Sequence, residues 1–189
     1  NLSTLNCPEE VELAEKLIEM HPWAHMVHFA RSGGEANAIA IRIARAAINK
    51  DKVVVCGYHG WHDWYLSTNL KSKSSLDDFL IPNMNVEGVP KYLKGSTTTF
   101  KFNDLNDFKN KFKKNNIGAV IMEVERNEKP KKKFLNEIRK LTKKKKIPLI
   151  FDECTSGFRE TRSGIFEKYG IYPDIAMFGK SIANGHAFS

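Results

Sequence analysis

Two residues with reactive side chains each follow a short apolar run. Asp152 comes directly after residues 148–151 (PLIF), and Lys180 directly after residues 175–179 (IAMFG). A carboxylate at the end of a buried strand must meet a cation or hydrogen-bond donors, because an unpaired buried charge is very costly, and a protonated pyridine nitrogen is one such partner. A lysine desolvated there loses proton affinity and becomes a nucleophile toward an aldehyde. Position alone leaves two other interpretations open: Asp152 as a loop cap, and Lys180 as a surface lysine.

A third candidate site is the turn formed by Ser32, Gly33 and Gly34, which lies between an apolar stretch and the start of a helical pattern. Free backbone N–H groups and the positive end of the helix dipole favour an anion at such a place, and glycine lets a phosphate approach the backbone. The alternative is an ordinary glycine turn capped by Ser32. The motif by itself therefore does not establish a phosphate site.

Taken together, the three places offer an anion cradle, a carboxylate and an amine nucleophile. In open α/β sheets, ligands bind beyond the carboxyl ends of the strands, so these groups are expected to meet. Pyridoxal 5'-phosphate requires such groups at its phosphate, its ring nitrogen and its aldehyde. Tyr58, which follows another apolar run, offers an aromatic face for the ring, with a core tyrosine as the alternative interpretation.

The elements that must position these residues alternate between helical and strand patterns, which predicts an α/β domain on a mostly parallel central sheet flanked by helices. No internal repeat or linker divides the chain, so one domain is expected. Residues 66–100 are expected to be irregular. The predicted helices are Pro8 to Met20, a helix with a buried stripe of Ala36, Ile39, Ala40, Ile43 and Ala47, and two helices marked by Leu105, Phe108 and Phe112 and by Leu135, Ile138 and Leu141. The predicted strands are 26–30, 53–56, 119–124, 148–151 and 175–178.

The composition limits the kinds of partner and metal site that can be expected. The net charge of +8 comes largely from lysine runs at 109–114, 129–133 and 143–146, which we interpret as solvated helix faces, with a basic polyanion-binding domain as the alternative. Three cysteines without CxxC spacing argue against a disulfide framework or a zinc site, so no metal is expected and a cytoplasmic location fits. No apolar run approaches the ~20 residues that a membrane span needs, so we expect neither a membrane nor a nucleic-acid partner.

Five segments, in order and spacing, resemble the class III aminotransferases, including the glutamate-1-semialdehyde aminomutases. They are SGGEANAIAIRIARA (32–46), CGYHGWH (56–62), AVIMEVERNE (119–128), PLIFDECTSGFR (148–159) and YGIYPDIAMFGKSIANG (169–185). The resemblance covers most of the chain. It implies a pyridoxal phosphate enzyme of fold type I that is a homodimer, with an active site shared between subunits.

The resemblance also implies roles for individual residues. Gly33 and Gly34, beside Ser32, bind the phosphate. Tyr58 stacks on the ring, Asp152 pairs with the ring nitrogen and Lys180 forms the Schiff base.

Three further residues receive roles only from the resemblance. Glu123 supports the Asp152 region, Thr155 contacts the ring hydroxyl, and Glu128 lies on the substrate side. The chain departs from the family pattern at Val124, where proline is usual, and at Cys154, where valine is usual. The pair Asn127-Glu128 stands where the aminomutases generally carry Gly-Asn.

The function that the resemblance implies is transfer of an amino group from an amine donor to a carbonyl acceptor, both small molecules, through Lys180. The alternatives are a glutamate-1-semialdehyde 2,1-aminomutase and an inactive fragment. Residues 1–189 are expected to be the cofactor-binding large domain, incomplete and without the family's small C-terminal domain.

Overall fold

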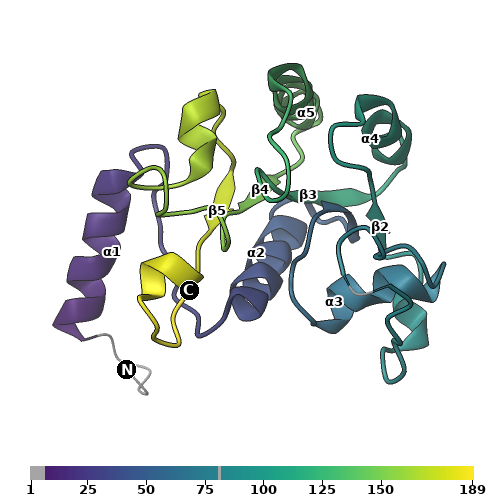
Figure 1. Ribbon diagram of the computed structural model, residues 1–189, viewed down its shortest axis with the longest axis horizontal. Coiled ribbons are helices and arrows are strands. Elements are labelled where there is room, and N and C mark those ends of the chain that lie inside the picture. The colour runs from purple at the N-terminus through teal and green to yellow at the C-terminus, as the bar shows by residue number, and fades with distance from the viewer. Residues whose placement is uncertain (1–6, 81) are drawn as a thin grey trace.

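The computed structural model describes residues 7–80 and 82–189, and its centre is a parallel sheet (Figure 1). The strands are β1 (Lys52–Cys56), β2 (Thr97–Thr99), β3 (Ile117–Glu123), β4 (Leu149–Asp152) and β5 (Ile175–Met177). They lie in the order β2-β1-β3-β4-β5, and each neighbouring pair is parallel. The strands' carboxyl ends therefore meet at one edge of the sheet. The predicted α/β class and its parallel sheet are confirmed.

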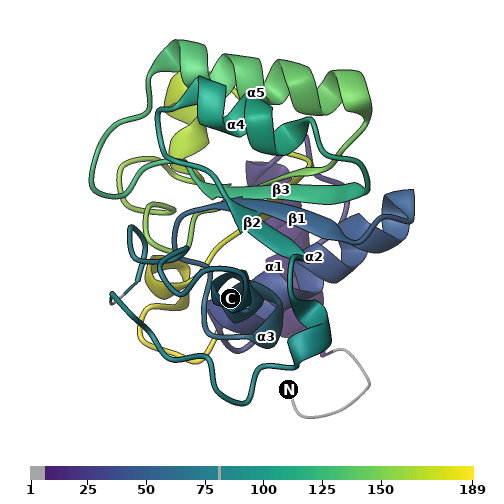
Figure 2. The ribbon, with the colours of Figure 1, turned by 90° about the vertical axis from the view of Figure 1, so that its right-hand side faces the viewer.

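Helices cover both faces of the sheet (Figure 2). α4 (Leu105–Phe112) and α5 (Lys132–Lys145) lie on one face, whereas α1 (Pro8–Met20), α2 (Gly33–Ile48) and α3 (Asp63–Leu66) lie on the other. Short 3₁₀ helices span Ser67–Leu70, Lys91–Leu93, Ile165–Tyr169 and Lys180–Ala183. Alternate residues of a strand point to opposite faces, so Val54 and Val120 pack toward α4 and α5 while Val55 and Ile121 pack toward α2. The sheet is therefore buried on both sides, which explains its unbroken apolar runs.

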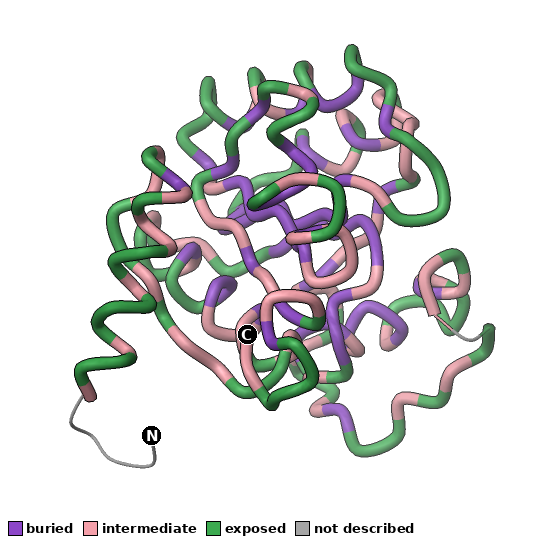
Figure 3. Tube along the Cα trace, turned by 60° about the vertical axis from the view of Figure 1, so that its left-hand side comes forward, coloured by how far each residue is buried: buried purple, intermediate pink, exposed green. Residues whose placement is uncertain are grey.

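The lysine runs lie on the outside of this architecture. In Figure 3 the strands are buried, while the outer sides of the helices are exposed. On α5 the core-facing residues are Phe134, Leu135, Ile138 and Thr142, and the lysines of the last turn are exposed. This arrangement supports the interpretation of the runs as solvated helix faces.

The buried side of α2 differs from the predicted stripe. Its buried residues are Asn37, Ala40, Ile41 and Ala44. Of the predicted set only Ala40 is buried, and Ile43 is 48% exposed. Alanine and isoleucine occur on several sides of this helix, so helical spacing permits more than one apolar stripe, and the polar Asn37 concealed the correct one.

The strand predicted at residues 26–30 is wrong. This segment is not part of the sheet, and Met26 is 87% exposed. At its end, Ala30 and Ser189 exchange two backbone hydrogen bonds of 2.8 Å. Residues 26–30 therefore do not form the ladder of backbone hydrogen bonds to a neighbouring strand that defines a β-strand.

Residues 66–100 are more regular than predicted, apart from residue 81, which lies outside the described residues. The missed strand is β2, whose three threonines pair with Val53, Val54 and Val55 of β1. An edge strand has one neighbour only and needs no alternating apolar pattern, so its sequence signal is weak. The remaining predicted helices and strands are confirmed to within a few residues at their ends.

Two general features bear on the chemistry. Among the described helices, none is both long and apolar enough to cross a bilayer. The thiols of Cys7, Cys56 and Cys154 are free.

Candidate active site

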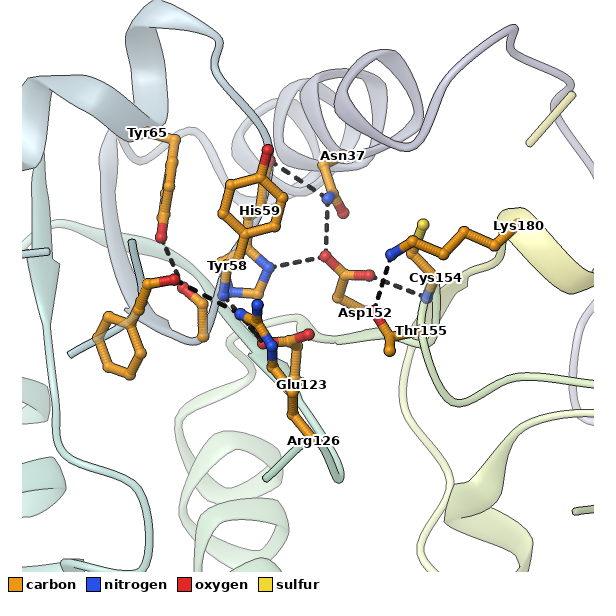
Figure 4. Close-up of polar contacts among 12 residues, drawn as sticks. Asn37, Tyr58, His59, Tyr65, Glu123, Arg126, Asp152, Cys154, Thr155 and Lys180 are labelled. Atoms are coloured by element: carbon orange, nitrogen blue, oxygen red, sulfur yellow. Dashed lines mark hydrogen bonds and ion pairs between the residues drawn. The ribbon is translucent and has the colours of Figure 1, made fainter. Parts of the chain in front are cut away.

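The carboxyl edge of the sheet brings together five of the predicted site residues, Tyr58, Glu123, Asp152, Thr155 and Lys180 (Figure 4). Asp152 is the last residue of β4 and stands opposite Glu123, the last residue of β3. Tyr58 lies two residues beyond β1, and Lys180 lies three residues beyond β5. Parallel strands in register therefore bring residues that are far apart in the sequence to one place.

The Asp152 carboxylate is buried and held by three donors. The residue is 3% exposed. Its Oδ2 accepts from Asn37 Nδ2 at 2.8 Å and is 2.8 Å from His59 Nδ1, while its Oδ1 accepts from the backbone N–H of Cys154 at 3.0 Å. These bonds replace much of the water that the carboxylate loses on burial. They also fix its orientation.

His59 is the residue that the sequence interpretation missed most clearly. It is 1% exposed. Because an ionised carboxylate only accepts hydrogen bonds, Nδ1 must carry the proton toward Asp152. Its ring stacks on Trp64 and meets Tyr65 edge-on, so two aromatic rings restrict the orientation of the imidazole. The signal that could have identified it is its position directly after Tyr58, at the same strand end.

Asn37 was missed because the wrong side of α2 was taken as buried. It is 2% exposed, and besides Asp152 it contacts the backbone carbonyl of His59 through Nδ2 at 3.4 Å. An amide on the sheet-facing side of a helix needs a polar partner there. A polar residue on the sheet-facing side of α2 therefore indicates a polar site at this end of the sheet.

Lys180 lies beside Asp152 in Figure 4 but has a different environment. It is exposed, so the expectation that the strand end desolvates this lysine is wrong for this chain. Its Nζ donates to Thr155 Oγ1 at 2.9 Å. Its backbone has a φ of 49°, in the left-handed region that is costly for a residue with a side chain. The loop from β5 thus presents the amine at the sheet edge in a strained backbone conformation.

The Cys154 side chain lies beside both Gly33 of the glycine turn and Gly179, which precedes Lys180. A Cβ atom added to Gly33 would lie 2.9 Å from Cys154 Sγ, and one added to Gly179 would lie 2.8 Å from it. Both positions therefore require glycine. Burial raises the pKa of the Cys154 thiol, and the nearby Asp152 adds to this effect.

The glycine turn is the N-terminus of α2. Ser32 is the N-cap, and its Oγ accepts from the backbone N–H of Glu35 at 3.3 Å. The first intrahelical bond is donated by Ala36, so the N–H groups of Gly33 and Gly34 have no acceptor within the helix. Two free amides at the positive end of a helix form an anion site.

Tyr58 and Glu123 are linked to each other. The backbone N–H of Tyr58 donates to Glu123 Oε2 at 2.9 Å, and the Arg126 guanidinium lies 5.7 Å from the centre of the Tyr58 ring. Burial raises the pKa of Glu123, while the Tyr58 N–H opposes this shift. Glu123 thus stands opposite Asp152 in the sheet, but its hydrogen bonds hold the Tyr58 backbone and Arg126.

Glu128 shares a cavity with Glu123 and Arg126. It is exposed and lines a cavity of about 270 Å³ together with Asp78, Lys101 and Arg126. A larger cavity, of about 480 Å³, lies between α1, residues 24–29 and β5. The lining of neither cavity includes Asp152 or Lys180. At the sheet edge, Asp152 is buried and Lys180 is exposed.

The donor set fits pyridoxal phosphate better than a metal. Among residues 7–80 and 82–189, no group of three or more histidine, cysteine or acidic side chains is arranged to hold a metal ion. The same stretch offers two free amides for a phosphate, an oriented carboxylate for a ring nitrogen and an amine for an aldehyde. The buried Nε2 of His59 and Oδ1 of Asn37 have no hydrogen-bond partner within the described part of the chain.

Comparison with known proteins gives consistent matches. The profile of a family described as aminotransferase class-III matches residues 1–189. The chain is 38% identical over 184 residues to the glutamate-1-semialdehyde 2,1-aminomutase of Methanobrevibacter smithii, covering 93% of this chain and 42% of that protein. It is 32% identical over 188 residues to the 3-aminobutyryl-CoA aminotransferase of Cloacimonas acidaminovorans, covering 94% of this chain and 41% of that protein. The chain thus spans about two fifths of these relatives.

Solved structures match the fold. An omega-transaminase from Sphaerobacter thermophilus superimposes with a TM-score of 0.85 at 27% identity, covering 98% of this chain and 44% of that one. A transaminase described with PLP bound gives a TM-score of 0.84 at 27% identity, again over 98% of this chain and 44% of that one. The expected architecture of fold type I is confirmed.

Proposed function

The chain belongs to the class III aminotransferase family, and from this premise we propose that residues 1–189 form the cofactor-binding large domain of a pyridoxal phosphate-dependent aminotransferase. The proposed reaction moves an amino group between a small amine donor and a small carbonyl acceptor. The observation that carries the proposal is the Asp152 carboxylate, oriented by three donors at the strand edge that also presents Lys180.

In this proposal Asp152 holds a proton on the ring nitrogen of the cofactor. When bound, pyridoxal phosphate supplies an aldehyde that condenses with amines and a ring that accepts electron density from the substrate carbon. A carboxylate keeps the ring nitrogen protonated only if it remains ionised. The contacts with Asn37, His59 and the Cys154 backbone hold the Asp152 carboxyl group in one orientation at the sheet edge.

Lys180 has two tasks. Its Nζ would hold the cofactor through the aldehyde carbon, by condensation with loss of water. With the substrate amine in its place, the free Nζ would move a proton at the substrate Cα as general base and general acid. The exposed position leaves the amine accessible to both partners. The bond from Nζ to Thr155 Oγ1 positions it.

The remaining residues bind and orient the cofactor. The amides of Gly33 and Gly34, with Ser32 as the cap, accept the phosphate. Tyr58 provides an aromatic face to the ring, and Glu123 positions Tyr58 through its backbone. Thr155 contacts the ring hydroxyl. Glu128 is proposed for the substrate side on the family resemblance, and it lines a cavity that Glu123 also lines.

A direct test is an amino-transfer assay on the chain with pyridoxal phosphate and a panel of amine donors and carbonyl acceptors. We expect a new amine to appear with the wild type and not with Lys180→Ala. The matched control is Lys140→Ala on the exposed side of α5, which should leave the yield unchanged. Equal yields from wild type and Lys180→Ala would refute the proposal.

An aminomutase is the second candidate, favoured by the similarity to the Methanobrevibacter smithii enzyme. A mutase rearranges glutamate-1-semialdehyde without a separate amino acceptor, whereas a transaminase needs one. The same assay, run on glutamate-1-semialdehyde alone, separates the two. Product formation without an acceptor would replace the first candidate by the second.

We further propose a homodimer in the cytoplasm that binds neither nucleic acid nor membranes. The family resemblance supports the dimer. The three free thiols support a reducing compartment. The placement of the lysines on outer helix faces supports the absence of a nucleic-acid site. Sedimentation of the complete protein tests the dimer, and salt-dependent DNA or RNA binding would contradict the last part.

A further inference from the structure

The loop after β1 lies across the first turn of α2. A Cβ atom added to Gly60 would lie 3.0 Å from Gly34 Cα, and Gly60 has a φ of +98°, which a residue with a side chain rarely adopts. Two glycines therefore allow the two backbones to touch. Their contact carries the next residues of the loop, Trp61 and His62, onto the free amides of α2.

The His62 ring faces Gly34. A Cβ atom added to Gly34 would lie 2.9 Å from His62 Cε1 and 3.0 Å from His62 Nδ1, so this edge of the imidazole covers the helix start. His62 is also the N-cap residue of α3, but its side chain makes no capping bond there. The imidazole is therefore directed at α2 instead of its own helix.

The His62 Nδ1 atom lies in an unfavourable environment. It is inaccessible to solvent and has no hydrogen-bond partner within the described part of the chain. Trp61 stacks on the ring with centroids 4.8 Å apart and planes at 28°, which limits its reorientation. A buried polar nitrogen without a partner is unfavourable. Such an atom, beside Gly34 in the first turn of α2, fits an anion that accepts from it and from the amides of this turn.

We propose that His62 Nδ1 is a third donor to the cofactor phosphate, beside the amides of Gly33 and Gly34. This inference rests on the proposed function. The group it recognises is a phosphate monoester dianion, whose three non-ester oxygens can accept several hydrogen bonds. His62 is a positioning residue: it holds the phosphate end of the cofactor and takes no part in the reaction at Lys180.

The experiment compares pyridoxal phosphate with pyridoxal, which lacks the phosphate. Each aldehyde is titrated against the chain, trapped by borohydride reduction, and quantified at Lys180 by peptide mass spectrometry. Asparagine places an N–H donor where Nδ1 lies, whereas glutamine places one where Nε2 lies. His62→Asn and His62→Gln are therefore matched variants, and His25→Asn, at an exposed histidine, is the control.

We expect His62→Gln to raise the half-saturating concentration of pyridoxal phosphate about tenfold. The value for pyridoxal should change by less than about twofold, and His62→Asn should restore binding of pyridoxal phosphate to within about threefold of wild type. Equal losses for both aldehydes, or an asparagine variant as weak as the glutamine variant, would overturn the inference and leave the proposed function intact. A wild-type chain that is not labelled at Lys180 would overturn both.

Discussion

The two reactive side chains of the site are held in opposite ways. Asp152 is 3% exposed and receives three hydrogen bonds from three different segments. Lys180 is exposed and has a left-handed backbone, and its Nζ donates to Thr155 and interacts with the Cys154 side chain. The acid is thus part of the folded core, whereas the amine lies on a surface loop. A carboxylate that must stay ionised needs fixed donors, while an amine that exchanges partners needs access.

The largest expected effect follows from removing the acid. Asp152→Ala leaves the buried His59 Nδ1–H without its acceptor, and leaves the Asn37 amide with only its 3.4 Å contact to the His59 carbonyl. We therefore expect a loss of about 3 to 5 kcal/mol in the free energy of unfolding. Urea denaturation monitored by circular dichroism measures it. Lys180→Ala is the matched variant at the exposed amine, and we expect it to change the free energy of unfolding by no more than about 0.5 kcal/mol. Similar losses for both variants would remove the contrast.

Glu153, the residue after Asp152, is a second buried carboxyl group. It is 0% exposed, and burial raises its pKa from 4.5 to about 7, despite hydrogen bonds from Ser156 and Phe166 that oppose the shift. The folded chain therefore binds the proton more tightly than the unfolded chain does. Its contribution to stability is fully present below pH 4.5 and is lost as the pH rises through about 7.

We expect the protein to lose about 3 kcal/mol of stability over this pH range. Glu153→Gln cannot ionise and should be more stable than the wild type at pH 8 but similar to it at pH 4.5. Denaturant midpoints across this range measure the difference. A wild type whose stability rises steadily with pH would contradict the assignment.

Asn37 gives an intermediate effect. Asn37→Ala removes one donor of Asp152 but leaves His59 and the Cys154 backbone in place, so we expect a loss of about 1 to 2 kcal/mol. Asn110→Ala, at an exposed position of α4, is the control and should change stability by less than about 0.5 kcal/mol. Thermal or urea unfolding separates them. Identical stabilities would mean that the bond to Asp152 contributes nothing.

The smallest effect is expected at the amine and has the opposite sign. Glycine adopts the left-handed backbone without the steric cost that a side chain adds, so Lys180→Gly should raise the stability by about 0.5 to 1 kcal/mol relative to Lys180→Ala. The pair isolates the backbone, because both variants lack the amine. A glycine variant less stable than the alanine variant would show that the φ of 49° is not strained here.

The comparison also explains what the sequence could predict. Asp152 and Lys180 were identifiable because each ends an apolar run, and parallel strands carry such ends to one edge. The support of Asp152 was not identifiable, because Asn37 looks like a polar interruption until the buried side of α2 is known. β2 escaped because an edge strand of threonines has little apolar signal. The run at 26–30 was misassigned because hydrophobicity alone cannot show whether a neighbouring strand is present.

Exposure is likewise a property of the fold and not of the local sequence. The same apolar context that suggests a buried Lys180 also precedes Asp152, yet only the acid is enclosed. Lys180 is exposed, and the Cys154 side chain packs against the preceding Gly179. Local patterns therefore located the reactive groups but could not assign their burial.

The central claim is that this chain assembles a cofactor site around Lys180, and site-resolved labelling tests it most directly. The chain is treated with limiting pyridoxal phosphate, reduced with borohydride and mapped by mass spectrometry. We predict that Lys180 is labelled ahead of the chain's other exposed lysines, and that Asp152→Ala, if folded, reduces this preference. Labelling spread evenly over the lysine runs of α4 and α5, with no preference for Lys180, would contradict the account.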